Sequence, residues 1–217
     1  MPLRRVAIYG GTFDPVHNGH VSVARNVLKL FELDELIFVP ASVPPHKRNA
    51  NITSAFHRFA MLALATELDQ RLLISTVELD SPDRPYAVDT VARMQDTSRR
   101  LFFLIGADSW AEITTWHEWQ KLLRMCDLIV VTRPGYGITE SPSRATVIDV
   151  RGFEAEAISD LLGGEQPPRV FVTDSVMMDI SATRIRAAVQ ANDPAALAVM
   201  VPPPVANYIE KHKLYGN

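Results

Sequence analysis

The fold is decided by a stretch near the amino terminus, Gly10-Gly11-Thr12-Phe13-Asp14-Pro15-Val16-His17-Asn18-Gly19-His20. The apolar residues 6–9 come directly before it and predict a buried parallel strand. Apolar residues at helical spacing follow it over residues 21–31 and predict an amphipathic helix. The stretch therefore joins a strand to a helix, which is where a doubly wound parallel sheet binds its ligands.

The residue types in this loop suit phosphate. Gly10 and Gly11 carry no Cβ, so the backbone can approach a phosphate closely. The free N–H groups at the start of the following helix favour an anion. His17 and His20 are three residues apart and face the same point if the helix begins near Asn18. We interpret the stretch as a phosphate-handling loop. In the alternative, the glycines only form a turn and the histidines only cap the helix.

Two common phosphate motifs, G-x-G-x-x-G and G-x-x-x-x-G-K-[ST], cannot be aligned with this stretch. His17-Asn18-Gly19-His20 matches the H-x-G-H signature of the nucleotidyltransferases related to class I aminoacyl-tRNA synthetases. The longer stretch closely resembles the family of bacterial nicotinate-nucleotide adenylyltransferases. This resemblance implies a Rossmann-like nucleotidyltransferase fold and an ATP site that includes Gly10, Gly11, Thr12, Phe13, His17, Gly19 and His20.

Size and composition are those of a folded enzyme-sized domain. The chain has 217 residues, 47% apolar residues and a net charge of −3, so no general basic field would attract nucleic acid. A single cysteine, Cys126, excludes an internal disulfide, and no Cys/His cluster suggests a metal site. No apolar run approaches the roughly 20 residues that span a bilayer, and none resembles a signal peptide. We expect a cytoplasmic protein that binds neither nucleic acid nor membrane.

Further apolar runs predict the remaining strands, at residues 36–39, 72–74, 101–105, 128–131, 145–150 and 169–172. Helical patterns alternate with them, including one whose inner face would be Phe56, Phe59, Ala60 and Ala63. Residues 135–168 are otherwise loop-rich. The alternation predicts an α/β protein with a doubly wound, mainly parallel sheet. We expect one domain over residues 1–217, with the C-terminal helical part, about 180–217, packed on it.

A second motif, Ile180-Ser181-Ala182-Thr183-Arg184-Ile185-Arg186, resembles the I-S-S-T-x-I-R signature of the same family. Ser181 and Thr183 can donate hydroxyl groups, and Arg186 offers a guanidinium suited to phosphate oxygens. Ser181 is also a plausible N-cap, and both roles are compatible because a helix start is itself an anion site. The family matches run from residue 8 to residue 186, and Ala182 replaces the usual serine.

The remaining candidates belong to the nucleoside and to the second substrate. Gly106-Ala107-Asp108 ends a strand at the carboxyl edge, where Asp108 could accept ribose hydroxyls or only cap the next helix. The resemblance implies a pyridine site in which Trp116 stacks on the ring, whereas Trp119 is expected in the core. The residues expected to bind nicotinate mononucleotide are Lys47, Tyr86, Thr90, Asp108, Trp116 and Arg133, although Arg48 and Arg84 could replace either cation.

No Ser-His-Asp order and no paired carboxylates stand out, which fits a nucleophile that is already ionised. We expect the phosphate of nicotinate mononucleotide to attack the α-phosphorus of ATP, with His17, His20 and Arg186 as the catalytic residues and Mg²⁺ carried by the ATP phosphates. The alternatives are another H-x-G-H enzyme, such as a phosphopantetheine adenylyltransferase, and a non-catalytic ATP sensor. The sequence leaves a homo-oligomer open.

Overall fold

The structure of the protein is a computed structural model that describes residues 3–42, 52–81, 83, 85–132, 142, 145–164, 167–174, 178 and 180–216. Within these ranges one seven-stranded sheet has the order β3-β2-β1-β4-β5-β7-β6, and every strand pair is parallel. The elements in chain order are β1 (Arg4–Gly11), α1 (Asn18–Leu30), β2 (Glu35–Pro40), α2 (Ala55–Thr66), β3 (Leu72–Ile74), α3 (Ala87–Met94), β4 (Arg99–Gly106), α4 (Ala107–Ala111), the 3-10 helix η2 (Ile113–Thr115), α5 (Trp119–Met125), β5 (Asp127–Val131), β6 (Val147–Asp149), α6 (Ala155–Leu161), β7 (Val170–Thr173), α7 (Ala182–Gln190), α8 (Pro194–Met200) and α9 (Pro203–Lys211).

The strand order places a topological switch point between β1 and β4. From β1 the chain moves outward through β2 and β3, returns to β4 beside β1, and then continues in the opposite direction. Tyr9 pairs with Leu104 across this junction, and Gly106 pairs with Val131 on the next strand. Open parallel sheets bind ligands at the carboxyl ends of the strands that flank such a point. The doubly wound α/β prediction is confirmed, and each predicted strand overlaps one strand of the sheet.

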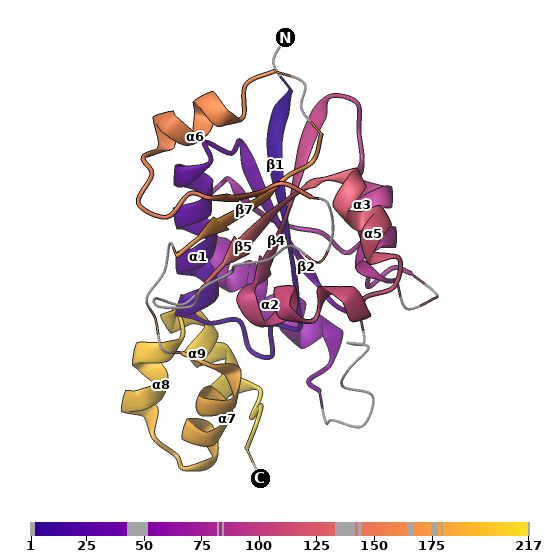
Figure 1. Cartoon of the computed structure of the whole chain (residues 1–217). Coiled ribbons are helices and arrows are strands. Elements are labelled where there is room, and N and C mark those ends of the chain that lie inside the picture. Colours follow the sequence, from indigo (N-terminus) through magenta and orange to yellow (C-terminus); the bar gives the residue numbers. More distant parts are fainter. Residues whose placement is uncertain are drawn as a thin grey trace.

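Side chains alternate between two hydrophobic cores, one on each face of the sheet. Ala7, Phe102 and Leu104 belong to the core beneath α1, while Val6 and Phe103 belong to the core beneath α3 and α5. Figure 1 shows α1 and α6 on one side of the sheet, α3 and α5 on the other, and α7 to α9 gathered at the carboxyl-terminal end.

The C-terminal helices share the first of these cores. Ile185 of α7, Val205 and Ile209 of α9 lie in the same buried cluster as Ala24 and Leu28 of α1. This shared core supports the expectation of one domain over residues 1–217, which stays a prediction. No helix of the described segments is both long enough and apolar enough to cross a bilayer.

Two helices differ from the sequence expectation. α6 lies in the stretch expected to be loop-rich, and α8, between α7 and α9, has no separate prediction within the expected C-terminal helical part. α6 has only seven residues, of which Ile158 is the buried one, so its apolar pattern is too short to read. α8 has a clearer signal, because Asp193 caps it and Pro194 stands in its first turn.

The expected inner face of α2 is wrong at Phe56 and Ala63, whereas Phe59 and Ala60 are half-buried. Phe56 is 84% exposed and Ala63 is exposed, while Met61, Leu62 and Arg58 are buried. Arg58 is 1% exposed because its guanidinium donates to main-chain carbonyls from three segments. Its acceptors are the carbonyl oxygens of Thr12 (2.8 Å), Ala41 (2.7 Å), Ser42 (3.1 Å) and Thr53 (3.0 Å).

Arg58→Met should lower the free energy of unfolding by about 3 kcal/mol or more, because four carbonyl groups lose their donor. Arg71→Met is the matched control: Arg71 is exposed and its guanidinium lies 3.5 Å from Asp69, so its loss should cost less than about 1 kcal/mol. Urea unfolding of both variants measures the difference. Equal losses would show that the buried guanidinium contributes nothing specific.

Candidate active site

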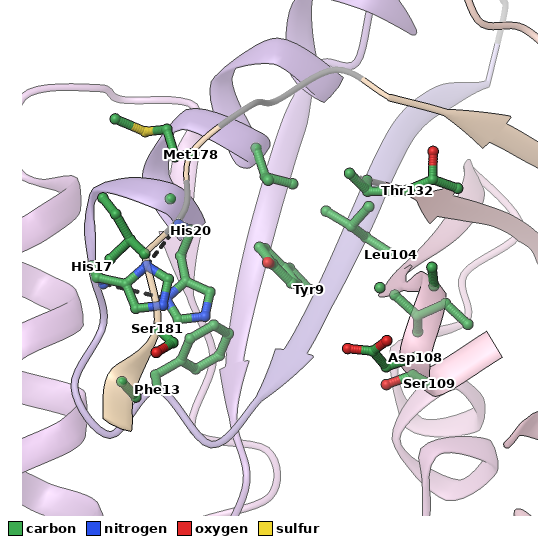
Figure 2. A pocket seen from close by; sticks show the side chains of 18 of the residues that line it. Tyr9, Phe13, His17, His20, Leu104, Asp108, Ser109, Thr132, Met178 and Ser181 are labelled. Carbon is green, nitrogen blue, oxygen red and sulfur yellow. Dashed lines mark hydrogen bonds between the residues drawn. The ribbon is translucent and has the colours of Figure 1, made fainter. Parts of the chain in front are cut away.

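A cavity of about 710 Å³ opens at the carboxyl edge of the sheet, at the switch point between β1 and β4. Tyr9, Leu104 and Thr132 form its floor along β1, β4 and the end of β5. Figure 2 shows His17 and His20 on one wall of the cavity and Asp108 with Ser109 on the opposite wall. The lining residues that the sequence predicted for ATP are Phe13, His17, Gly19, His20, Gly106, Asp108 and Ser181.

The two histidines cap α1 and each other. His17 is the N-cap: its Nδ1 accepts the N–H of His20 at 3.4 Å, and Nδ1 of His20 accepts the N–H of His17 at 3.2 Å. The rings stack with their centroids 3.6 Å apart. A Cβ on Gly19 would come within 3.0 Å of Nδ1 of His17, so the glycine of the H-x-G-H motif makes room for this stack. The capping role and the phosphate role predicted for these residues are therefore compatible.

This cap determines where the histidine protons lie. Burial lowers the pKa of His17 to about 4, and burial together with the neighbouring His17 lowers the pKa of His20 well below its usual value. Both rings are thus neutral at pH 7, and because each Nδ1 accepts a hydrogen bond, each proton is assigned to Nε2. Among the described residues neither Nε2–H has a hydrogen-bond partner, so both rings offer a donor to a phosphate oxygen beside the start of a helix.

The second motif meets the first loop through Arg186. Its Nη1 donates to the carbonyl oxygen of Asp14 at 2.8 Å, and its Nη2 donates to the hydroxyl of Thr183 at 3.4 Å. Ser181 caps α7 by accepting the N–H of Arg184 at 3.3 Å, as the sequence indicated. Two motifs about 170 residues apart in sequence are joined at one site, although Arg186 and Thr183 are not among the residues that line the cavity.

Of the other residues predicted to contact ATP, some line the cavity and some do not. Gly10, Gly11 and Thr12 close β1 and its loop without lining the cavity. A Cβ on Gly11 would come within 2.8 Å of the Phe13 ring, so packing also requires a glycine there. Asp108 lies in the first turn of α4 and is not its N-cap, since Gly106 takes that position.

Of the residues expected to bind the second substrate, Asp108 lines this cavity, whereas Tyr86, Thr90 and Trp116 are not among its lining residues. Trp116 meets the Phe103 ring edge-on, with centroids 6.3 Å apart, and is half-buried, as is Trp119. Tyr86 is 42% exposed and its ring lies 4.3 Å from that of His117. Thr90 is buried and its hydroxyl donates to Glu78 at 2.7 Å, so that group is already engaged. Lys47 and Arg133, with Arg48 and Arg84, lie outside the described residues.

Among the described residues, no group of three or more His, Cys, Asp or Glu side chains is arranged to hold a metal ion.

Comparison with known proteins gives the family. A model of cytidylyltransferase-like proteins matches residues 8–188. A protein of Desulfatibacillum aliphaticivorans is 34% identical over 97% of this chain and 99% of its own length, and one of Citrifermentans bemidjiense is 34% identical over 97% and 98%. Both are named probable nicotinate-nucleotide adenylyltransferase. The chain belongs to the nicotinate-nucleotide adenylyltransferase family.

The fold of this adenylyltransferase family member is also that of a solved relative. The nicotinic acid mononucleotide adenylyltransferase of Plasmodium falciparum, complexed with NaAD, superimposes with a TM-score of 0.72 over 98% of this chain and 97% of the other, at 19% identity.

Sequence reasoning missed several residues that build the site of this adenylyltransferase. Tyr9 and Thr132 line the cavity, and Asp14 lines it while binding Thr53, Arg186 and Tyr215. Asp14 stands inside the first motif, so its position was available from the sequence. Tyr9 ends the apolar run before the glycines, and its position at a strand end was the only signal.

The lowered pKa of His17 predicts a pH dependence of stability. The unfolded chain binds a proton at His17 below about pH 6.5, but the ligand-free folded protein binds it only below about pH 4. The free energy of unfolding should therefore be complete above pH 6.5 and fall as the pH drops from 6.5 to 4, with a His17 share of up to about 3 kcal/mol.

His17→Asn keeps a capping oxygen and removes the titrating ring. Denaturant unfolding between pH 7 and pH 4 should show a flatter profile for this variant than for the wild type. Parallel profiles would mean that His17 is not held in its neutral form.

Proposed function

We propose that the protein transfers AMP from ATP to nicotinate mononucleotide, which yields nicotinate adenine dinucleotide and pyrophosphate. The observation that carries this proposal is the junction of the two motifs: Arg186 binds the loop of Asp14 at 2.8 Å, beside a cavity walled by His17 and His20. The names of the relatives supply the acceptor. ATP and nicotinate mononucleotide are small-molecule substrates, Mg²⁺ enters with ATP, and we place the reaction in the cytoplasm.

In this mechanism the acceptor phosphate is the nucleophile. Its oxygen forms a bond to the α-phosphorus of ATP while the bond from that phosphorus to the bridging oxygen breaks, and the electron pair leaves with pyrophosphate. The acceptor phosphate is ionised at neutral pH, so no base has to remove a proton. The protein contributes alignment and stabilisation of the negative charge that builds on the phosphate oxygens.

The residues divide these tasks. The Nε2–H groups of His17 and His20 and the start of α1 donate to phosphate oxygens. Arg186 keeps Nη1 on Asp14 and offers its remaining N–H groups to the same phosphates. Asp108, across the cavity, accepts from the ribose hydroxyls, and Gly106 leaves room for the nucleoside.

The acceptor lies toward Trp116 on the opposite face of the sheet edge. Gly10 connects the two sides, because a Cβ there would lie 3.5 Å from Cζ of Phe103, the ring that Trp116 meets edge-on. Tyr86 is the N-cap of α3, and its carbonyl accepts the N–H of Asp89, while the first-turn N–H groups of Ala87 and Val88 can bind a carboxylate. Lys47 and Arg133 are proposed as further cations for this substrate, and Thr90 supports the turn through Glu78.

Release of pyrophosphate from ATP and Mg²⁺ with each candidate acceptor tests the function. Turnover with nicotinate mononucleotide, at a kcat/KM far above that with phosphopantetheine, supports the proposal. Turnover only with phosphopantetheine favours the other enzyme class, and ATP binding without turnover on any acceptor favours a sensor.

His20→Ala should lower kcat by about a hundred- to a thousandfold, since it removes one preorganised donor. His20→Gln is the control for the helix cap, because glutamine at this position can still accept the N–H of His17. We expect both variants to lose turnover and the glutamine variant to keep its melting temperature. Unchanged turnover at saturating ATP in either variant would remove His20 from the mechanism.

The acid should be preferred over the amide of the mononucleotide by about ten- to a hundredfold in kcat/KM. Backbone N–H groups satisfy both oxygens of a carboxylate, but leave the NH₂ of a carboxamide facing a donor. Trp116→Ala should weaken both acceptors alike, because stacking does not distinguish them. Equal use of acid and amide by the wild type contradicts the first statement, and a selective loss of the acid in the variant contradicts the second.

A further inference from the structure

Tyr215 reaches back from the carboxyl-terminal end of the described chain to the first loop. It follows α9 in a left-handed backbone conformation, with φ of 64°, which is uncommon for an aromatic residue. Its hydroxyl donates to Oδ1 of Asp14 at 2.7 Å. Burial raises the pKa of Tyr215, so the hydroxyl keeps its proton at neutral pH and acts as a donor. The strained turn is thus matched by a specific contact inside the site.

Asp14 is the point where several parts of the site meet. Its side chain is only 6% exposed, and its other carboxylate oxygen, Oδ2, accepts the N–H of Thr53 at 3.2 Å. Its carbonyl oxygen accepts Nη1 of Arg186 at 2.8 Å. Two residues earlier, the carbonyl of Thr12 accepts Arg58. Tyr215 therefore holds the side chain of Asp14, and the main-chain carbonyl of the same residue binds Arg186, the guanidinium that the mechanism uses.

We propose that Tyr215 is a positioning residue for nucleotidyl transfer: its hydroxyl fixes Asp14 and, through the carbonyl of Asp14, the guanidinium of Arg186. The inference rests on the proposed function, in which Arg186 binds the reacting phosphates. Without the hydroxyl, Oδ1 of Asp14 lacks this donor in a buried place, and the carboxylate turns to find another. The main chain at Asp14 then shifts, and Arg186 is no longer held in one orientation before ATP binds.

If Arg186 loses its fixed orientation, the transition state is destabilised more than the complex with ATP. A small misplacement of a positioning group costs up to about a hundredfold in rate, whereas ATP keeps its contacts with His17, His20 and the start of α1. Tyr215→Phe should therefore lower kcat about ten- to a hundredfold and change the KM for ATP by less than about threefold.

Tyr208→Phe is the matched control. Tyr208 lies in α9, and its hydroxyl is 2.9 Å from Nδ1 of His57 on α2, so its removal also costs one hydrogen bond of the C-terminal helices. That bond does not reach Asp14. Both variants should lose a similar amount of melting temperature, while kcat falls in Tyr215→Phe alone. A fall of kcat by the same factor in both variants, or in neither, overturns the proposal.

Two further measurements separate positioning from general stability. In an Arg186→Ala background, Tyr215→Phe should lower kcat by less than about twofold, because the group it positions is gone. A full additional loss would contradict action through Arg186. Amide hydrogen exchange at Thr53 and across residues 12–17 should become faster in Tyr215→Phe and stay unchanged in Tyr208→Phe.

The exchange measurement also keeps the two proposals distinguishable. If the wild type makes the dinucleotide and Tyr215→Phe is as fast, the proposed function stands and the role of Tyr215 is rejected. If the wild type does not use nicotinate mononucleotide, the proposed function fails, and amide exchange at Thr53 alone decides whether Tyr215 fixes the loop. Exchange at Thr53 that is unchanged in Tyr215→Phe rejects the role of Tyr215.

Discussion

The site depends on one buried guanidinium. Arg58 binds the loop after β1 through Thr12, the segment after β2 through Ala41 and Ser42, and the approach to α2 through Thr53. A buried charge is stable only when its donors are satisfied, so these three segments have to keep their relative positions. The glycine-rich loop is thereby fixed without any contact to a ligand. The loop therefore loses its conformational entropy when the protein folds, and substrate binding does not have to order it.

In the histidine pair, one ring nitrogen has a structural role and the other has a chemical role. Nδ1 of each imidazole closes the start of α1, and this leaves Nε2–H as the group available to phosphate. A serine or an aspartate would cap the helix equally well but would offer no second donor. Burial lowers the pKa of both histidines and keeps both rings neutral in the ligand-free protein. An incoming phosphate therefore meets hydrogen-bond donors that carry no positive charge.

Local signals in the sequence were sufficient for the sheet and for the two motifs. β1, β2 and β4 contain apolar runs that end at glycine or proline, and the apolar face of α1 has ordinary helical spacing. The inner face of α2 could not be predicted, since Arg58 is buried by carbonyls from loops that precede it in the chain and Phe56 is left outside. Nor could the contact of Tyr215 with Asp14 be foreseen, because nothing local in either segment specifies a partner some 200 residues away. Side-chain networks that cross between elements are set by tertiary packing, which hydrophobic periodicity does not describe.

The place of β1 in the sheet has a consequence for how the chain reaches this structure. β1 is an interior strand, and its first neighbour to be synthesised is β2, whereas its other neighbour, β4, pairs Arg99 with Arg4 and Phe103 with Ile8. Until β4 has left the ribosome, one edge of β1, whose Val6, Ala7 and Ile8 are fully buried in the folded protein, stays unpaired, and such edges invite pairing with other chains. Pairs this distant in sequence also form slowly. The position of β1 beside β4 creates the ligand-binding switch point. The same position leaves one edge of β1 unpaired, and so open to aggregation, while the first hundred residues of the chain are made.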